Sequence, residues 1–176
     1  MNQPIIMDIE ASGFGSGSYP IEVGVVLGDN TEYSWLIKPL SHWQHWCSQA
    51  ETTHGISREQ LKREGQDPAR VAAELNQLLH HSRAYSDAWV YDSTWLARLF
   101  YETGQQTAFR LDSIHALLSD SDREQWQRCR NAVLASSGLK PHRAGTDAAI
   151  IQQTLAMVLS DPETRTSTGT PNPLAA

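Results

Sequence analysis

Two acidic residues separated by a single isoleucine, Asp8 and Glu10, end a short apolar run that starts at Pro4. The isoleucines of this run predict a buried strand, and residues i and i+2 of a strand point to the same face. The two carboxylates should therefore project together from the end of the strand, where a divalent cation would relieve their repulsion. Oxygen ligands of this kind suit Mg²⁺ or Mn²⁺. Because a D-x-E pair is common by chance, this interpretation needs further residues.

A histidine and an aspartate supply the second element. His142 follows Pro141 and is predicted to lie in a loop, and Asp147 enters the first turn of the last predicted helix. An imidazole on a loop beside a fixed carboxylate suits a general base that takes a proton from water held by a metal. His115 and Asp120 have the same spacing, but in a helix five residues would place their side chains on different faces.

Asp92 is the third candidate. It stands where a helix is predicted to start, at Asp92 or Ser93, and an aspartate in that place is most often an N-cap. Capping and metal binding both remain open from the residues alone. Asp87, five residues earlier, is a rival for the same role.

These residues must be positioned by the strands and helices around them. After an initial hairpin of strands, strands alternate with helices, which predicts a mixed sheet flanked by helices. Pro68 suits the first turn of a helix, and a glycine at position 104 suits a helix end. Strands are predicted over 4–9, 21–27, 32–37, 84–86 and 109–111, and helices over 58–63, 68–81, 92–101, 113–118, 122–136 and 145–159. The stretch 41–57 is predicted to be irregular.

Taken together, these motifs resemble the DnaQ-like exonucleases of the DEDDh branch. The family's motifs occur in order from Ile5 to about Leu159. The matching segments are Asp8-Ile9-Glu10, Ile21-Glu22-Val23-Gly24, His54-Gly55-Ile56, Tyr91-Asp92 with Trp95-Leu96, and His142, Ala144, Asp147 and Ala148. The chain departs from the family at Asp87-Ala88, where His-Asn is common, and Arg143 stands where the tyrosine branch would have Tyr.

The resemblance implies an RNase H-like α/β fold with a mixed five-stranded sheet. It implies a metal-dependent 3′–5′ exonuclease in which two Mg²⁺ or Mn²⁺ ions and a histidine base release nucleoside 5′-monophosphates. The implied metal ligands are Asp8, Glu10, Asp92 and Asp147, and the implied base is His142. The alternatives are an oligoribonuclease-like enzyme on short RNAs and a non-catalytic nucleic-acid-binding module on the same fold.

Three residues are assigned to substrate binding. Phe14 lies in a glycine-rich loop where the family places an apolar residue against the terminal base, and one aromatic ring can stack on any base. His54 is interpreted as a structural loop residue or a contact to the substrate strand. Arg143 belongs to a run of basic residues after position 122 that could follow phosphates, although a solvated helix face is the more frequent explanation of such a run.

Composition limits the remaining choices. The 176 residues, 40% of them hydrophobic, fit one exonuclease domain over 1–160 and a flexible Pro/Thr/Ser-rich tail over 161–176. The net charge of −6 argues against a wholly basic nucleic-acid platform, but not against chemistry in one cleft. No signal or membrane segment is visible, and Cys47 and Cys129 suit reduced thiols, so a cytoplasmic location is expected. The expected partners are single-stranded DNA or RNA 3′ ends, no membrane is expected, and a homodimer remains an option.

Overall fold

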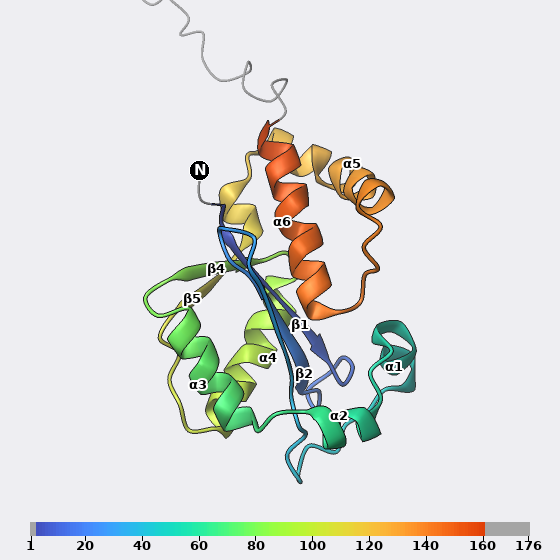
Figure 1. Ribbon diagram of the computed structural model, residues 1–176, viewed down its shortest axis with the longest axis vertical. Helices are drawn as coiled ribbons and strands as arrows, with labels where there is room; N and C mark the ends of the chain where they lie inside the picture. Colours follow the sequence, from blue (N-terminus) through green and yellow to red (C-terminus); the bar gives the residue numbers. More distant parts are fainter. Residues whose placement is uncertain (1–2, 161–176) are drawn as a thin grey trace, which may run out of the picture.

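A mixed five-stranded sheet forms the centre of the protein, as the sequence predicts (Figure 1). The computed structural model describes residues 3–160, and the predicted tail over 161–176 lies outside them. The strands are β1 (Ile5–Ala11), β2 (Pro20–Val26), β3 (Glu32–Leu36), β4 (Arg83–Ser86) and β5 (Arg110–Ser113). Their order in the sheet is β3-β2-β1-β4-β5, with antiparallel pairing of β1, β2 and β3 and parallel pairing of β1, β4 and β5.

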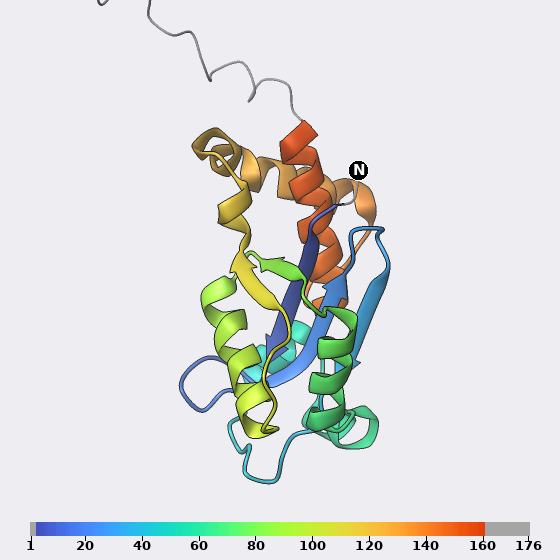
Figure 2. The ribbon, with the colours of Figure 1, turned by 90° about the vertical axis from the view of Figure 1, so that its left-hand side faces the viewer.

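Helices cover both faces of this sheet. They are α1 (Ser48–His54), α2 (Arg58–Glu64), α3 (Pro68–Leu78), α4 (Trp89–Glu102), α5 (Asp120–Ser137) and α6 (Ala144–Ser160), with a 3-10 turn at Ile114–Leu117. Helices α3 and α4 pack with Met7 and Ile9 of β1 in one core, whereas α6 packs with Ile6 in another. Figure 2 shows α5 and α6 lying together at one end of the molecule. In the described residues, no helix has both the length and the apolar character that crossing a bilayer requires.

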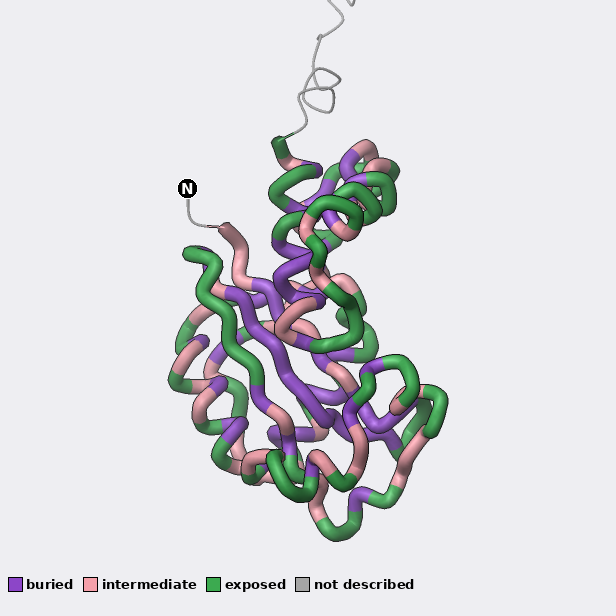
Figure 3. Tube along the Cα trace, turned by 45° about the vertical axis from the view of Figure 1, so that its right-hand side comes forward, coloured by how far each residue is buried: buried purple, intermediate pink, exposed green. Residues whose placement is uncertain are grey.

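The alternation of β1 between these two cores determines where its carboxylates point. Met7 and Ile9 face α3 and α4, so Asp8 and Glu10 share the opposite face with Ile6, toward α6. Neighbouring β2 is buried along its whole length, whereas the first three residues of β3 are exposed (Figure 3). The acidic pair therefore lies on a strand near the centre of the sheet.

Several predicted boundaries are wrong, and the reasons are local. Helix α4 begins at Trp89 after Ala88, which makes no capping bond, so the expected start at Asp92 or Ser93 is corrected. The stretch 41–57 contains α1, which the pattern missed because its only buried residue is His54. Strand β5 is displaced to Arg110–Ser113, α3 ends at Leu78, and α5 starts at Asp120 because the Ser119 side chain caps it.

Candidate active site

Helix α6 places Asp147 beside the acidic pair of β1. Glycine allows the close approach, because a Cβ on Gly24 would overlap the backbone of Ala144 and Gly145 at the start of the helix. Gly24 is also the cross-strand partner of Asp8. A carboxylate oxygen of Glu10, one of Asp147 and a ring nitrogen of His142 lie within 4.8 Å of one another. Residues far apart in the sequence thus converge at one end of β1.

His142 lies in the turn that precedes α6. Its φ of 76° is in the left-handed region, which non-glycine residues rarely adopt, and its side chain is exposed. Its backbone N–H donates to Asp147 Oδ2 at 2.7 Å. This bond closes the turn and fixes the histidine beside the carboxylate.

Asp92 joins the acidic cluster from the first turn of α4 and does not cap that helix. Its side chain is 1% exposed, and the Ser86 hydroxyl at the end of β4 donates to its Oδ2. Its Oδ1 is buried with no hydrogen-bond partner, and the same is true of Asp147 Oδ1. Buried carboxylate oxygens without donors are costly unless a cation satisfies them, so these residues fit a divalent metal ion.

The electrostatics of the cluster support the same conclusion. Burial, followed by the charges of Asp92, Asp147, Glu10 and Asp87, raises the pKa of Asp8 well above its ordinary value. Burial and the charges of Asp147 and Glu22 raise the pKa of Glu10 to about 7, although Arg143 lowers it. Burial also raises the pKa of Asp92 to about 7 and raises that of Asp147. Carboxylates that resist ionisation together are held ionised by bound cations.

Asp87 lies close to this cluster but has a partner of its own. Its carboxylate is 3.8 Å from Nη1 of Arg130 on α5, and the charge of Arg130 lowers a pKa that burial raises. No sequence pattern indicates this pairing or the Ser86 contact, because in each case the two partners lie on different segments that the fold brings together.

A cavity of about 290 Å³ adjoins Glu10 and His142. Phe14, His54 and Trp95 also line it. Phe14 is 69% exposed, and its ring centroid lies 5.3 Å from that of Tyr91 and 6.1 Å from that of Trp95. The cavity therefore joins an aromatic wall to the predicted metal site.

His54, which lines this cavity, carries a ring nitrogen without a partner. Its Nδ1 accepts the N–H of Ile56 at 3.1 Å, which leaves the proton on Nε2, a buried atom with no partner. Burial lowers the pKa of His54, so the ring is a neutral N–H donor.

Arg143 does not line the cavity. Its Nε and Nη2 donate to the two carboxylate oxygens of Glu22, at 3.0 and 2.6 Å. Its side chain remains 47% exposed. Its predicted role in substrate binding stays a prediction, whereas its contact with Glu22 is a structural fact that the sequence did not indicate.

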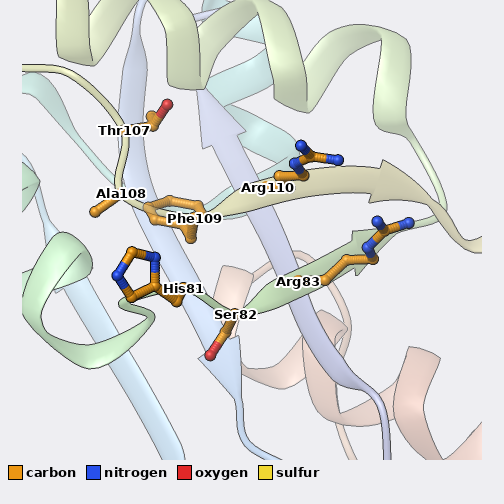
Figure 4. A pocket seen from close by; sticks show the side chains of 7 residues that line it. All are labelled: His81, Ser82, Arg83, Thr107, Ala108, Phe109 and Arg110. Atoms are coloured by element: carbon orange, nitrogen blue, oxygen red, sulfur yellow. The ribbon is translucent and has the colours of Figure 1, made fainter.

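A second cavity, of about 430 Å³, lies where β4 and β5 begin and includes none of the predicted site residues (Figure 4). Arg83 and Arg110, which are paired in register, project from it in the same direction. Arg83 is bound to Asp112 at 2.7 Å. This basic cavity is thus separate from the acidic cluster.

Comparison with known proteins supports the fold. No protein-family model matches the sequence, and no curated protein sequence matches it. Among solved structures, exonuclease I from Methylocaldum szegediense is similar with a TM-score of 0.70 and 10% identity, over 94% of this chain and 42% of that one. E. coli exonuclease I in complex with a dA16 oligonucleotide is similar with a TM-score of 0.64 and 14% identity, over 89% of this chain and 40% of that one.

A zinc-ion-bound form of the E. coli exonuclease I–ssDNA complex is also similar, with a TM-score of 0.58 and 16% identity, over 89% of this chain and 39% of that one. The present chain thus spans about two fifths of the length of these structures. The resemblance seen in the motifs is confirmed at the level of architecture: the chain has the RNase H-like fold of exonuclease I.

Proposed function

We propose that the protein is a metal-dependent 3′–5′ exonuclease that hydrolyses single-stranded nucleic acid and releases nucleoside 5′-monophosphates. The observation that carries the proposal is the meeting of Glu10, His142 and Asp147 within 4.8 Å, at the rim of a cavity with an aromatic wall. The oligonucleotide complexes of exonuclease I, which share the fold, support single-stranded DNA as substrate. The cytoplasmic location and the homodimer remain predictions from the sequence.

Asp8, Glu10, Asp92 and Asp147 would hold two Mg²⁺ or Mn²⁺ ions. When bound, such ions lower the pKa of a water molecule and stabilise negative charge on the phosphate and on the leaving 3′ oxygen. The buried, partnerless oxygens of Asp92 and Asp147 fit this role. Much of the catalysis would come from positioning and charge stabilisation, so the loss of one carboxylate should be severe.

His142 would act as general base. Its ring takes the proton of the attacking water as the water oxygen forms a bond to phosphorus and the bond from phosphorus to the 3′ oxygen breaks. The shortened strand keeps the 3′ oxygen, which becomes a hydroxyl, and the mononucleotide keeps the phosphate. The exposed position of His142 beside Asp147 leaves the ring free to accept and then release this proton.

The substrate's terminal nucleotide would occupy the cavity of about 290 Å³. Phe14 would stack on its base, and the Nε2–H of His54 would donate to a polar group of the nucleotide. Arg143 would contact a phosphate with the part of its guanidinium that Glu22 does not use. Stacking tolerates any base, so little sequence preference is expected.

The test is digestion of 5′-labelled single-stranded oligonucleotides with Mg²⁺ or Mn²⁺. DNA and RNA of several lengths are compared, with a circular strand and a chelator as controls. A ladder that shortens from the 3′ end supports the proposal, and preference for very short RNAs supports the oligoribonuclease-like alternative. Cleavage of the circle, release from the 5′ end or activity in the chelator would refute it. Binding without hydrolysis would favour the non-catalytic module.

A further inference from the structure

Glu22 is a buried carboxylate on β2 that has no place in the mechanism above. It is 1% exposed, yet donors surround both of its oxygens. Besides the two bonds from Arg143, Oε2 accepts the backbone N–H of Ala144 at 3.0 Å, and Oε1 accepts the Ser34 hydroxyl at 3.0 Å. A buried charge with this many charge-assisted bonds holds its partners in one arrangement.

Besides Ser34, the partners of Glu22 are the two residues that follow His142. Arg143 and Ala144 connect the histidine to the start of α6, and the bond to Ala144 satisfies an N–H that the helix leaves free. Two residues further along β2, Gly24 admits the backbone of Ala144 and Gly145. The segment is therefore attached to β2 at two successive points.

This attachment bears directly on His142. The histidine has a left-handed φ of 76°, and its backbone bond to Asp147 comes from the same turn. The position of its ring at the metal site therefore depends on the path of the backbone through 142–144. Glu10, the cross-strand partner of Glu22, has a carboxylate oxygen within 4.8 Å of a ring nitrogen of His142.

We propose that Glu22 is a positioning residue for His142: it holds the turn before α6 so that the imidazole faces the reacting water. The kinetic part of this inference rests on the proposed exonuclease function. If Glu22 merely stabilised the fold, its loss would lower the melting temperature and leave turnover by the folded protein intact.

The chain offers a matched control in Asp122. This carboxylate is also buried, 8% exposed, and it also bonds at a helix start, where it accepts the N–H and the hydroxyl of Ser119. It caps the start of α5, and that helix carries none of the predicted site residues. Glu22→Gln and Asp122→Asn thus make the same carboxylate-to-amide change, one beside the site and one away from it.

The experiment measures melting temperature, kcat and KM of both variants in the full chain, on a 5′-labelled DNA oligonucleotide with saturating Mn²⁺. Glu22→Gln should lower kcat by about tenfold or more with little change in KM, and Asp122→Asn should change kcat by less than about twofold. Adding Glu22→Gln to His142→Ala should cause no further loss, because Glu22 acts through the histidine. Unchanged kcat in Glu22→Gln, or losses that multiply in the double variant, would overturn the proposal.

Hydrogen exchange separates this inference from the proposed function. Without substrate, Glu22→Gln should speed exchange of the amides of 142–147, whereas Asp122→Asn should leave them unchanged. If the wild type releases no nucleotide, the exonuclease proposal fails while the exchange result still tests the attachment. Unchanged exchange in 142–147 would overturn the role of Glu22 even in an active enzyme.

Discussion

Asp92→Asn should stabilise the protein in the absence of metal. Asp92 is 1% exposed and one of its oxygens has no partner. Burial raises its pKa from 3.8 to about 7. The Ser86 hydrogen bond lowers this pKa, and the charge of Asp87 raises it further. Since one pH unit corresponds to about 1.4 kcal/mol, an ionised Asp92 would lower the free energy of unfolding by up to about 4 kcal/mol at pH 8.

The direction in which stability changes with pH follows from the pKa of Asp92 in the unfolded and folded states. The unfolded carboxyl loses its proton near 3.8, whereas the folded one keeps it up to about pH 7. The destabilisation is therefore absent below the unfolded pKa, grows as the pH rises between the two values, and is complete above about 7. Asparagine cannot ionise and can still accept the Ser86 bond, so it removes the penalty.

The assay is thermal unfolding in a chelator at pH 5 and pH 8. At about 2–4 °C per kcal/mol for a domain of this size, the variant should melt several degrees above wild type at pH 8 and by less at pH 5. Mn²⁺ should raise the melting temperature of wild type far more than that of the variant. A variant that melts at or below wild type at pH 8 in chelator, or that gains equally from Mn²⁺, would refute this electrostatic account.

Three further outcomes are expected. In His142→Ala, kcat should fall to a small fraction of the wild-type value, and activity should no longer rise with pH, because only a neutral imidazole accepts the proton. An equal loss in His115→Ala would contradict the choice of base. Phe14→Ala should raise KM by about 5- to 150-fold, since stacking contributes about 1–3 kcal/mol per base, and an unchanged KM for DNA oligonucleotides would exclude the stacking role. Gly24→Ala should displace the start of α6, and nuclease assays with melting curves should show lost activity in a protein that still folds, whereas full activity would argue against the close approach.

The order and type of most elements could be predicted because local pattern determines them. Pro68 starts α3 as expected, and Asp8 and Glu10 share one face because the alternation of a strand requires it. The start of α4 could not be predicted, because Trp89 and its neighbours begin the helix without a side-chain cap. The indole N–H of Trp89 instead donates to the carbonyl oxygen of Leu111, a contact between distant elements that no local pattern reports.

The candidate site divides in the same way. Motif order indicated the acidic residues and His142, but no local pattern reports which of them have partners. Glu22 and Arg143 are 121 residues apart, and Arg130 and Asp87 belong to different elements. Contacts of this kind depend on the assembled sheet and its two helical layers, so the sequence predicts which residue types are available and the fold decides their pairing.

The distribution of the site along the chain has a consequence for synthesis. Asp8 and Glu10 lie on the first strand, whereas Asp147 lies on α6, the last element of the described residues, and His142 lies in the turn just before it. On the proposed mechanism, a nascent chain would carry half of its metal ligands early and yet be unable to cut nucleic acid until α6 emerged and docked. Nuclease activity would thus begin only once the domain had folded around the site.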